Sequence, residues 1–273
     1  MNLTRDISFL IDHTTLKIGG RAQQLHPKSL PSLVELLVQL DCCRVLGNGS
    51  NLLVSDHPID IPVVCTKSCR GFQVIGDRCY VETGCLMPRI VNTLGRANLG
   101  GLEYFASIPG TLGGAIYMNA GRGEQFNLSI SQAVVYVDVF DMLKKAELRL
   151  SAEQCVFGYR KSIFHEHPEW VVLGAMLQFT PSPHAIVRQR IQQRLSVSQR
   201  YQDLRFPNAG TTFCRVDEPH GMRRFMGIQI GGAAYSSVTP NWVINLGGAS
   251  FDDVTKLLEI SPQNAQLEWS VWT

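Results

Sequence analysis

The stretch "GLEYFASIPGTLGGAIYMNAG", residues 101–121, repeats glycine among apolar and aromatic side chains. A flexible linker is polar and rich in serine as well as glycine, whereas this stretch is apolar between its glycines. Glycine has no Cβ atom, so it allows another group to approach the backbone closely. The sequence therefore predicts that something presses against this stretch of backbone.

A second glycine-rich loop, "GNGSN" at residues 47–51, lies between two apolar runs that are typical of strands. Its glycines allow consecutive backbone N–H groups to point into one concavity, which binds phosphate without a cationic side chain. A tight hairpin has the same letters, so this loop by itself leaves both interpretations open. Together with residues 107–115, it favours two loops that hold the two sides of a diphosphate ligand.

The composition of the 273-residue chain is that of an ordinary globular protein, with 45% hydrophobic and 18% charged residues. The net charge of +2, from 25 basic and 23 acidic residues, predicts neither a nucleic-acid nor a membrane partner. No apolar run approaches the roughly 20 residues of a membrane span, and Asp6 and Asp12 interrupt the only candidate signal segment. We therefore predict a cytoplasmic protein, and we expect a monomer.

The eight cysteines include no CxxC pair, and most lie in apolar surroundings. Buried, reduced thiols are therefore favoured over a zinc site. His165 and His167 lack the spacing of metal ligands, so we predict no metal.

Periodicity predicts helices at residues 30–40, 87–98 and 186–202, and a short helix at 250–260 with Ser250 as its N-cap. Strands are predicted at residues 61–67 and 79–85, and a strand pair at 133–141 and 146–155. Two prolines in "FTPSPHA", residues 179–185, mark a boundary. Strands with scattered helices predict an α+β chain of at least two domains.

Seven motifs in order along the chain resemble the bacterial UDP-N-acetylenolpyruvoylglucosamine reductases: "HTTLKIGGRA", "GNGSNLLVSD", residues 101–121, "FGYRKSIF", "PNAGTTF", "IGGAAYSS" and "NWVIN". The resemblance covers nearly the whole chain and is to the shorter, second type of this family. It implies a FAD-binding domain of the vanillyl-alcohol-oxidase type at residues 1–180, in two subdomains that divide near residues 70–80. It also implies an α+β substrate-binding domain at residues 181–273.

The reaction that the resemblance implies makes UDP-N-acetylmuramate for peptidoglycan, with FAD and NADPH as cofactors and a UDP-sugar as substrate. Hydride passes from NADPH to the flavin, and then to the β-carbon of an enolpyruvyl ether. Negative charge then spreads into the substrate carboxylate, so the enzyme must stabilise that charge and deliver a proton to the α-carbon.

The resemblance assigns cofactor-binding residues to both loops. "GNGSN" would hold the pyrophosphate of FAD, and residues 108–115 would lie along the flavin, where larger side chains would collide with it. The residues concerned in the first loop are Gly47, Asn48, Gly49, Ser50, Asn51 and Leu52. Those in the second are Ser107, Ile108, Pro109, Gly110, Thr111, Gly113, Gly114, Ala115, Asn119 and Gly121.

Arg160 matches the family arginine that pairs with the substrate carboxylate and the developing enolate. A planar guanidinium suits this role because it binds both carboxylate oxygens and keeps its charge. Tyr159 beside it either contacts the substrate or packs against the arginine. The alternative for Arg160 is a surface arginine at a turn.

Two residues depart from the family pattern at the site of proton delivery. The family donor is a serine, but "NAGT" places Thr211 there, with a hydroxyl of similar acidity and a methyl group that restricts χ1. The C-terminal "QLEWSVWT" puts Ser270 where the family has a glutamate, and keeps Glu268 one step back on the same strand face. Glu268 is either a relocated catalytic carboxylate or an ordinary exposed one.

Two further arginines are candidates for substrate contacts. Arg205 lies where the family places a basic substrate contact, and Arg215 would reach the UDP diphosphate. Three functions remain open: a working reductase, a divergent FAD-binding relative with another substrate, and a catalytically silent FAD-binding protein.

Overall fold

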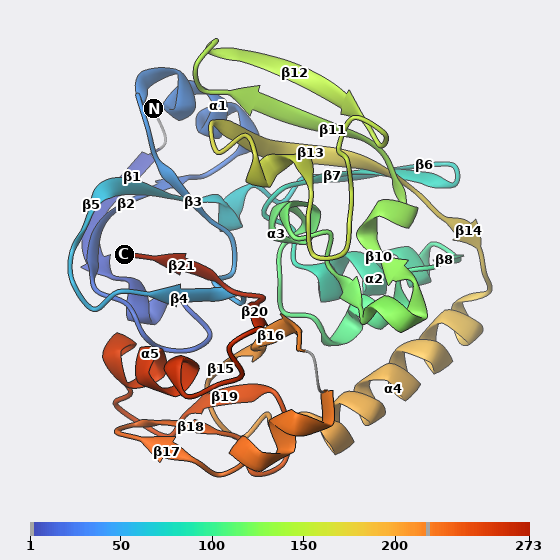
Figure 1. Ribbon diagram of the computed structural model, residues 1–273. Helices are drawn as coiled ribbons and strands as arrows, with labels where there is room; N and C mark the ends of the chain where they lie inside the picture. The colour runs from blue at the N-terminus through green and yellow to red at the C-terminus, as the bar shows by residue number, and fades with distance from the viewer. Residues whose placement is uncertain (1–2, 217–218) are drawn as a thin grey trace. The chain divides into compact units, whose positions relative to one another are not determined.

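The computed structural model describes residues 3–216 and 219–273, and it divides into two compact units (Figure 1). Unit 1 consists mainly of Gln24–Asn48 and Ile61–Ser196, and unit 2 of Ile7–Gln23, Gly49–Asp60 and Val197–Thr273. These units are defined by packing, whereas the boundary predicted after residue 180 concerns cofactor and substrate binding and stays a prediction.

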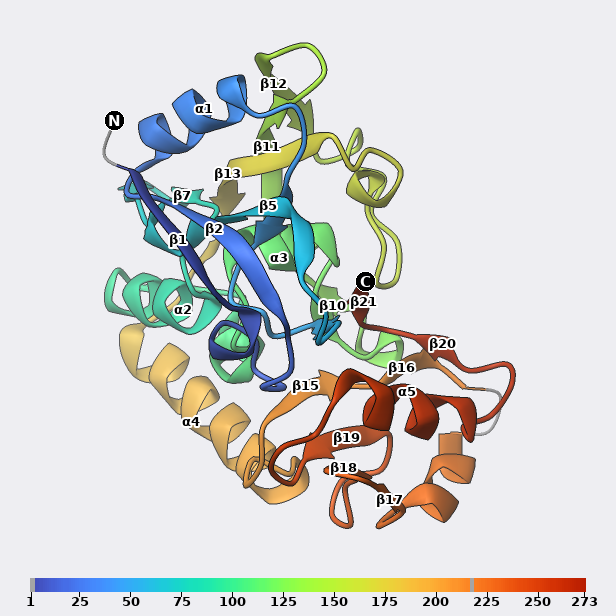
Figure 2. The same cartoon turned by 90° about the vertical axis from the view of Figure 1, so that its left-hand side faces the viewer.

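Unit 1 is built on a five-stranded antiparallel sheet that has a layer of helix on each face (Figure 2). Its strands run in the order β12 (Ala146–Ser151), β11 (Val134–Asp141), β13 (Trp170–Gln178), β7 (Arg78–Glu82) and β6 (Phe72–Ile75). Successive side chains of a strand point to opposite faces. Val139 of β11 points to one face and belongs to the cluster that contains the buried residues of α2 (Met87–Arg96) and α3 (Leu112–Tyr117). Phe140 points to the other face and belongs to the cluster that contains the buried residues of α1 (Leu30–Gln39).

Helix α1 confirms the helix predicted at residues 30–40. Ser29 caps it by accepting a hydrogen bond from the backbone N–H of Ser32. Leu33, Leu36 and Leu37 recur at the spacing of one helical face, and all three are buried against the sheet.

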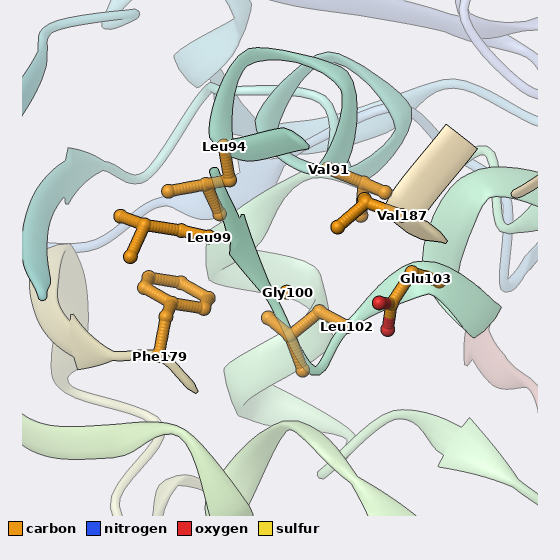
Figure 3. Close-up of a pocket in the computed structure, with 8 residues that line it drawn as sticks. All are labelled: Val91, Leu94, Leu99, Gly100, Leu102, Glu103, Phe179 and Val187. Carbon is orange, nitrogen blue, oxygen red and sulfur yellow. The ribbon is translucent and has the colours of Figure 1, made fainter. Parts of the chain in front are cut away.

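Helices α2 and α4 (His184–Tyr201) approach closely in unit 1, where a Cβ atom on Gly95 of α2 would lie 2.9 Å from a methyl carbon of Val187. The hollow beside this contact is an apolar part of the core (Figure 3). It is lined by Val91, Leu94, Leu99, Gly100, Leu102, Glu103, Phe179 and Val187. None of these is a predicted site residue, so the hollow is a product of helix packing.

Unit 2 contains a four-stranded sheet covered by α5 (Phe251–Glu259). The strand order is β15 (Asn208–Thr211), β19 (Trp242–Asn245), β18 (Ala233–Tyr235) and β17 (Gln229–Ile230). Ser250 caps α5 as predicted, because its hydroxyl accepts from the backbone N–H of Asp253 while the Asp253 carboxylate accepts from that of Ser250.

A further four-stranded sheet has the order β1 (Leu3–Phe9), β2 (Arg21–Pro27), β5 (Ile59–Cys65) and β3 (Arg44–Leu46). Short strands form four two-stranded pairs: β8 (Leu99–Gly100) with β14 (Thr180–Pro181), β9 (Gly121–Arg122) with β10 (Leu128–Ser129), β16 (Phe213–Arg215) with β20 (Gln266–Leu267), and β4 (Leu52–Val54) with β21 (Ser270–Trp272). Within residues 3–216 and 219–273, no helix combines the length and apolar character needed to cross a bilayer.

Candidate functional site

The loop "GNGSN" is not a hairpin turn. The strand before it, β3, pairs in parallel with β5, whereas the strand after it, β4, pairs in parallel with β21. Gly49 has φ +63°, and a Cβ atom there would lie 2.2 Å from the carbonyl oxygen of His13, so the position requires glycine. Within the described part of the chain, the backbone N–H groups of Asn48, Gly49 and Ser50 donate to no protein acceptor. Such a run of backbone donors is suited to a phosphate group.

The start of this loop contacts the second glycine-rich segment inside unit 1. A Cβ atom on Gly47 would lie 2.5 Å from the Thr111 hydroxyl oxygen, and the Asn48 side-chain amide donates to the carbonyl oxygen of Pro109. Thr111 also caps α3 by accepting from the backbone N–H of Gly114 at 3.4 Å. The segments predicted to hold the two sides of a diphosphate therefore lie next to each other.

The glycines of residues 101–121 differ in whether a contact within the protein requires the absence of a side chain. A Cβ atom would lie 2.2 Å from the Thr83 hydroxyl oxygen at Gly113, and 1.9 Å from the Leu128 carbonyl oxygen at Gly121. At Gly114, which is exposed, the nearest atom to a Cβ would be 3.7 Å away. The protein's own packing thus explains Gly113 and Gly121, but it leaves Gly114 as an open surface that a ligand can approach.

Other residues of the second segment serve the fold. Ala115 is buried in the main core of unit 1, and Ile108 packs against that core. The carbonyl oxygen of Gly110 accepts from the backbone N–H of Met87, and this bond holds the segment against the start of α2. In the first segment, Leu52 pairs with Ser270 in the β4–β21 ladder.

Arg160 lies at a tight turn and has the left-handed backbone φ of +54°. The turn is closed by reciprocal backbone hydrogen bonds between Gly158 and Lys161, at 2.9 and 3.2 Å. A positive φ is uncommon in a residue with a side chain, but Lys17, Lys145 and Val156 share it, so the conformation of Arg160 reflects the tight turn. One guanidinium nitrogen, Nη2, donates to the carbonyl oxygen of Gly121 at 2.9 Å, and the guanidinium carbon is 5.1 Å from the centre of the Tyr159 ring.

Asn119 holds this turn in place, since its side-chain amide donates to the carbonyl oxygen of Gly158 at 2.8 Å. Its own backbone is left-handed, with φ +41°, and its side chain is buried. Asn119 and Gly121, which the resemblance assigns to the cofactor, are therefore also the residues that hold Arg160 in place.

The residues expected to deliver the proton lie in unit 2, around the loop's last residue, Asn51. The backbone N–H of Glu268 donates to the carbonyl oxygen of Thr212 at 2.8 Å, which places Glu268 beside the strand end that carries Thr211. The Asn51 amide donates to the Glu268 carbonyl oxygen, and the backbone N–H of Ser270 donates to the Asn51 carbonyl oxygen, both at 3.0 Å.

The side chains of two adjacent threonines are in different environments. Thr211 is exposed, whereas Thr212 is fully buried and its hydroxyl accepts from the backbone N–H of Val243 at 3.2 Å. Alternate side chains of a strand point to opposite faces. Of the two, only Thr211 has a hydroxyl that a bound substrate could reach.

The two candidate substrate arginines of unit 2 are both exposed. Arg205 donates two hydrogen bonds to the buried carboxylate of Asp203, at 2.8 and 2.9 Å. These bonds, together with one from the Ser236 hydroxyl, lower the pKa of Asp203 to about 2. Arg215 ends β16, where it pairs with Gln266 of β20.

One arginine that the motifs did not single out lies beside a predicted site residue. Arg194 of α4 donates from Nε to the hydroxyl oxygen of Ser107 at 2.8 Å. The sequence carried a signal for it: Val187, Ile191 and Arg194 follow the i, i+4, i+7 spacing of one helical face, so the arginine continues a buried stripe.

Comparisons with known proteins agree on one family, although no protein-family model matches the chain. The UDP-N-acetylenolpyruvoylglucosamine reductase of Thermotoga sp. (strain RQ2) is 32% identical over 268 residues, which is 95% of this chain and 87% of that protein. The protein of the same name from Rubrobacter xylanophilus is 33% identical over 264 residues, covering 91% of this chain and 85% of its own length.

A crystal structure of the UDP-N-acetylenolpyruvylglucosamine reductase from Thermus caldophilus matches with a TM-score of 0.86 and 30% sequence identity. The match covers 99% of this chain and 100% of that one. It confirms the predicted fold class, an α+β chain with the fold of this reductase. The chain therefore belongs to the family of UDP-N-acetylenolpyruvoylglucosamine reductases, which are FAD-dependent oxidoreductases.

Proposed function

We propose that this protein uses NADPH and FAD to reduce UDP-N-acetylglucosamine enolpyruvate to UDP-N-acetylmuramate in peptidoglycan synthesis. The main support is the similarity to reductases of that name over nearly the full length of both chains. We further propose that the protein acts in the cytoplasm, where both nucleotide substrates are available.

The residues present fit FAD. The backbone donors of residues 48–50 suit its pyrophosphate, and the open surface at Gly114 permits close approach of a flat ring system. Asn48 and Thr111 keep these two segments together through their contacts with Pro109 and Gly47. When bound, FAD supplies hydride transfer from NADPH to the β-carbon of the enolpyruvyl group.

Arg160 would bind the substrate carboxylate and stabilise the negative charge that develops on it. Its turn is fixed from two sides, by Asn119 through Gly158 and by Gly121 through the guanidinium itself. A guanidinium held in advance loses little freedom when the charge appears, and this favours the transition state over the bound substrate.

Thr211 would donate its hydroxyl proton to the α-carbon and recover a proton from solvent, since its side chain is exposed. Glu268 is the carboxylate that we assign to the support of this transfer, because its main chain bonds to Thr212. Ser270 replaces the glutamate of the family pattern, and this departure favours the second candidate function, a relative that reduces another substrate.

The proposed function is tested by supplying the purified protein with NADPH and UDP-N-acetylglucosamine enolpyruvate. We expect FAD to be released on denaturation, and one UDP-N-acetylmuramate to form for each NADPH oxidised, with mass spectrometry as the readout. FAD in the protein without this product would favour the relative with another substrate. Absence of FAD would contradict the assignment of both loops.

A further inference from the structure

Arg194 is held at one edge of the segment predicted to lie along the flavin. It is half-buried on the inner face of α4, and its hydrogen bond to Ser107 fixes its Nε atom. Ser107 ends the 3₁₀ helix η3 (Glu103–Ser107) and directly precedes Ile108 and Pro109. The remaining guanidinium nitrogens of Arg194 are not used by this bond.

Arg122 lies close to the same place. It belongs to β9, which packs against η3, and it follows Gly121, the residue that accepts from Arg160. Its guanidinium carbon is 3.8 Å from the centre of the Phe126 ring, so the ring orients the cation.

The two guanidinium groups repel each other. Burial and the positive charge of Arg122 both lower the pKa of Arg194. Among residues 3–216 and 219–273, no carboxylate lies within ion-pair distance of either group. Two like charges at a half-buried place repel each other, which raises the electrostatic free energy of the site. An anion bound between them would attract both charges and lower that free energy.

We propose that Arg122 and Arg194 form a binding site for a nucleotide phosphate group beside Ser107. A phosphate accepts several charge-assisted hydrogen bonds at once, and it is the anion that arginine pairs bind with most complementarity. This inference rests on the proposed function for its ligand, because that function brings two such groups to the protein besides the pyrophosphates of FAD and NADPH. These two groups are the diphosphate of the UDP-sugar and the 2′-phosphate of NADPH.

The test is isothermal titration of the FAD-loaded protein with two probes, UDP and adenosine 2′,5′-bisphosphate. Substitution Arg194→Gln removes the charge and keeps a side chain that can donate to Ser107. We expect it to weaken binding of at least one probe by about 10- to 100-fold, the effect of losing one charge-assisted hydrogen bond. Arg122→Gln, on a separate element, should weaken the same probe.

Arg188→Gln is the matched control. Arg188 is an exposed arginine on the same helix, and its substitution removes the same charge. Its dissociation constants should stay within about twofold of the wild-type values. Weakening of UDP alone assigns the site to the sugar nucleotide, and weakening of the bisphosphate alone assigns it to NADPH. The site would be overturned if Arg194→Gln and Arg122→Gln each bound both probes with the wild-type dissociation constants. It would also be overturned if the wild-type protein bound neither probe.

Product formation by the wild-type protein, measured in parallel, separates this inference from the proposed function. A wild type that forms product while the arginine variants bind both probes normally would refute only the phosphate site. A wild type without product, but with probe binding that depends on Arg122 and Arg194, would refute only the substrate assignment.

Discussion

Thr211 is the residue that the resemblance places at the position of the family's proton-donating serine. Its hydroxyl is exposed at the end of β15, while the next hydroxyl along the chain, that of Thr212, is bonded in the core. The methyl group of threonine restricts the rotamers in which the hydroxyl can face a substrate. We therefore expect Thr211 to deliver the proton from fewer side-chain rotamers than a serine would, and so more slowly.

Thr211→Ala should leave reduction of the flavin by NADPH unchanged and slow reoxidation by substrate by about 10²- to 10⁴-fold, since a general acid contributes this much. Thr211→Ser, the control, should match or exceed the wild-type rate. Both half-reactions are followed by flavin absorbance in a stopped-flow instrument. Normal reoxidation in the alanine variant would remove Thr211 from the mechanism.

Asp203 stabilises the segment that leads to Thr211. Its buried carboxylate accepts from Arg205 and Ser236, and its carbonyl oxygen accepts from the Asn208 amide at 3.4 Å. The pKa of Asp203 is lowered to about 2 from an ordinary value of 3.8. A depressed pKa contributes stability that is present above pH 4 and is lost as the pH falls towards 2.

Asp203→Asn should lower the free energy of unfolding by about 2 kcal/mol at pH 6, and this deficit should shrink as the pH falls from 4 towards 2. Urea unfolding at a series of pH values measures it. Asp252→Asn is the control, because Asp252 pairs with Lys256 on an exposed helix face, at 2.6 Å. A deficit that is independent of pH for Asp203→Asn would mean that the carboxylate charge contributes nothing.

At the scale of elements, α3 combines a packing glycine with a glycine that packing does not require. Gly113→Ala should destabilise the fold by about 1–3 kcal/mol, since the new methyl group meets the buried Thr83. Gly114→Ala should preserve or slightly raise the stability of the deflavinated protein, because alanine favours a helix, and should weaken FAD binding at least tenfold.

Thermal unfolding of the deflavinated variants and titration with FAD separate the two effects. If Gly114→Ala binds FAD as tightly as the wild type, the cofactor does not contact this surface.

Some of these elements can be predicted from local sequence, and others cannot. Helices α1, α2 and α5 follow from local signals, such as the caps at Ser29 and Ser250 and the apolar spacing of Leu33, Leu36 and Leu37. The partners of β3 and β4 do not, because β4 pairs with β21 at the far end of the chain. Whether "GNGSN" was a hairpin or a ligand loop therefore depended on a contact that local sequence does not encode.

At the scale of the whole molecule, the chain is folded by contacts that are distant in sequence. The buried Asn245 amide, for example, donates to the carbonyl oxygen of Leu16 at 3.0 Å. For this reason unit 2 collects Ile7–Gln23 and Gly49–Asp60 along with the C-terminal part, a division that a proline-rich boundary near residue 180 does not predict by itself.

The seven motifs identified the family from sequence, and the full-length similarity to its members confirms it. The roles of Thr211, Glu268 and Ser270 stay predictions: Thr211 and Ser270 depart from the pattern that the resemblance implies, and Glu268 is retained one step back on the same strand. Arg194 escaped motif reasoning because its signal is a charge that continues the buried stripe of Val187 and Ile191 and belongs to no sequence motif.

Our proposal is that this chain reduces an enolpyruvyl sugar nucleotide with Thr211 and Ser270 at the positions where the resemblance expects a serine and a glutamate. It is tested most directly by anaerobic stopped-flow absorbance. The bound flavin is reduced with one equivalent of NADPH and then mixed with UDP-N-acetylglucosamine enolpyruvate. We expect rapid recovery of the oxidised flavin spectrum with UDP-N-acetylmuramate as the product. A flavin that NADPH reduces and that this substrate does not reoxidise would contradict it.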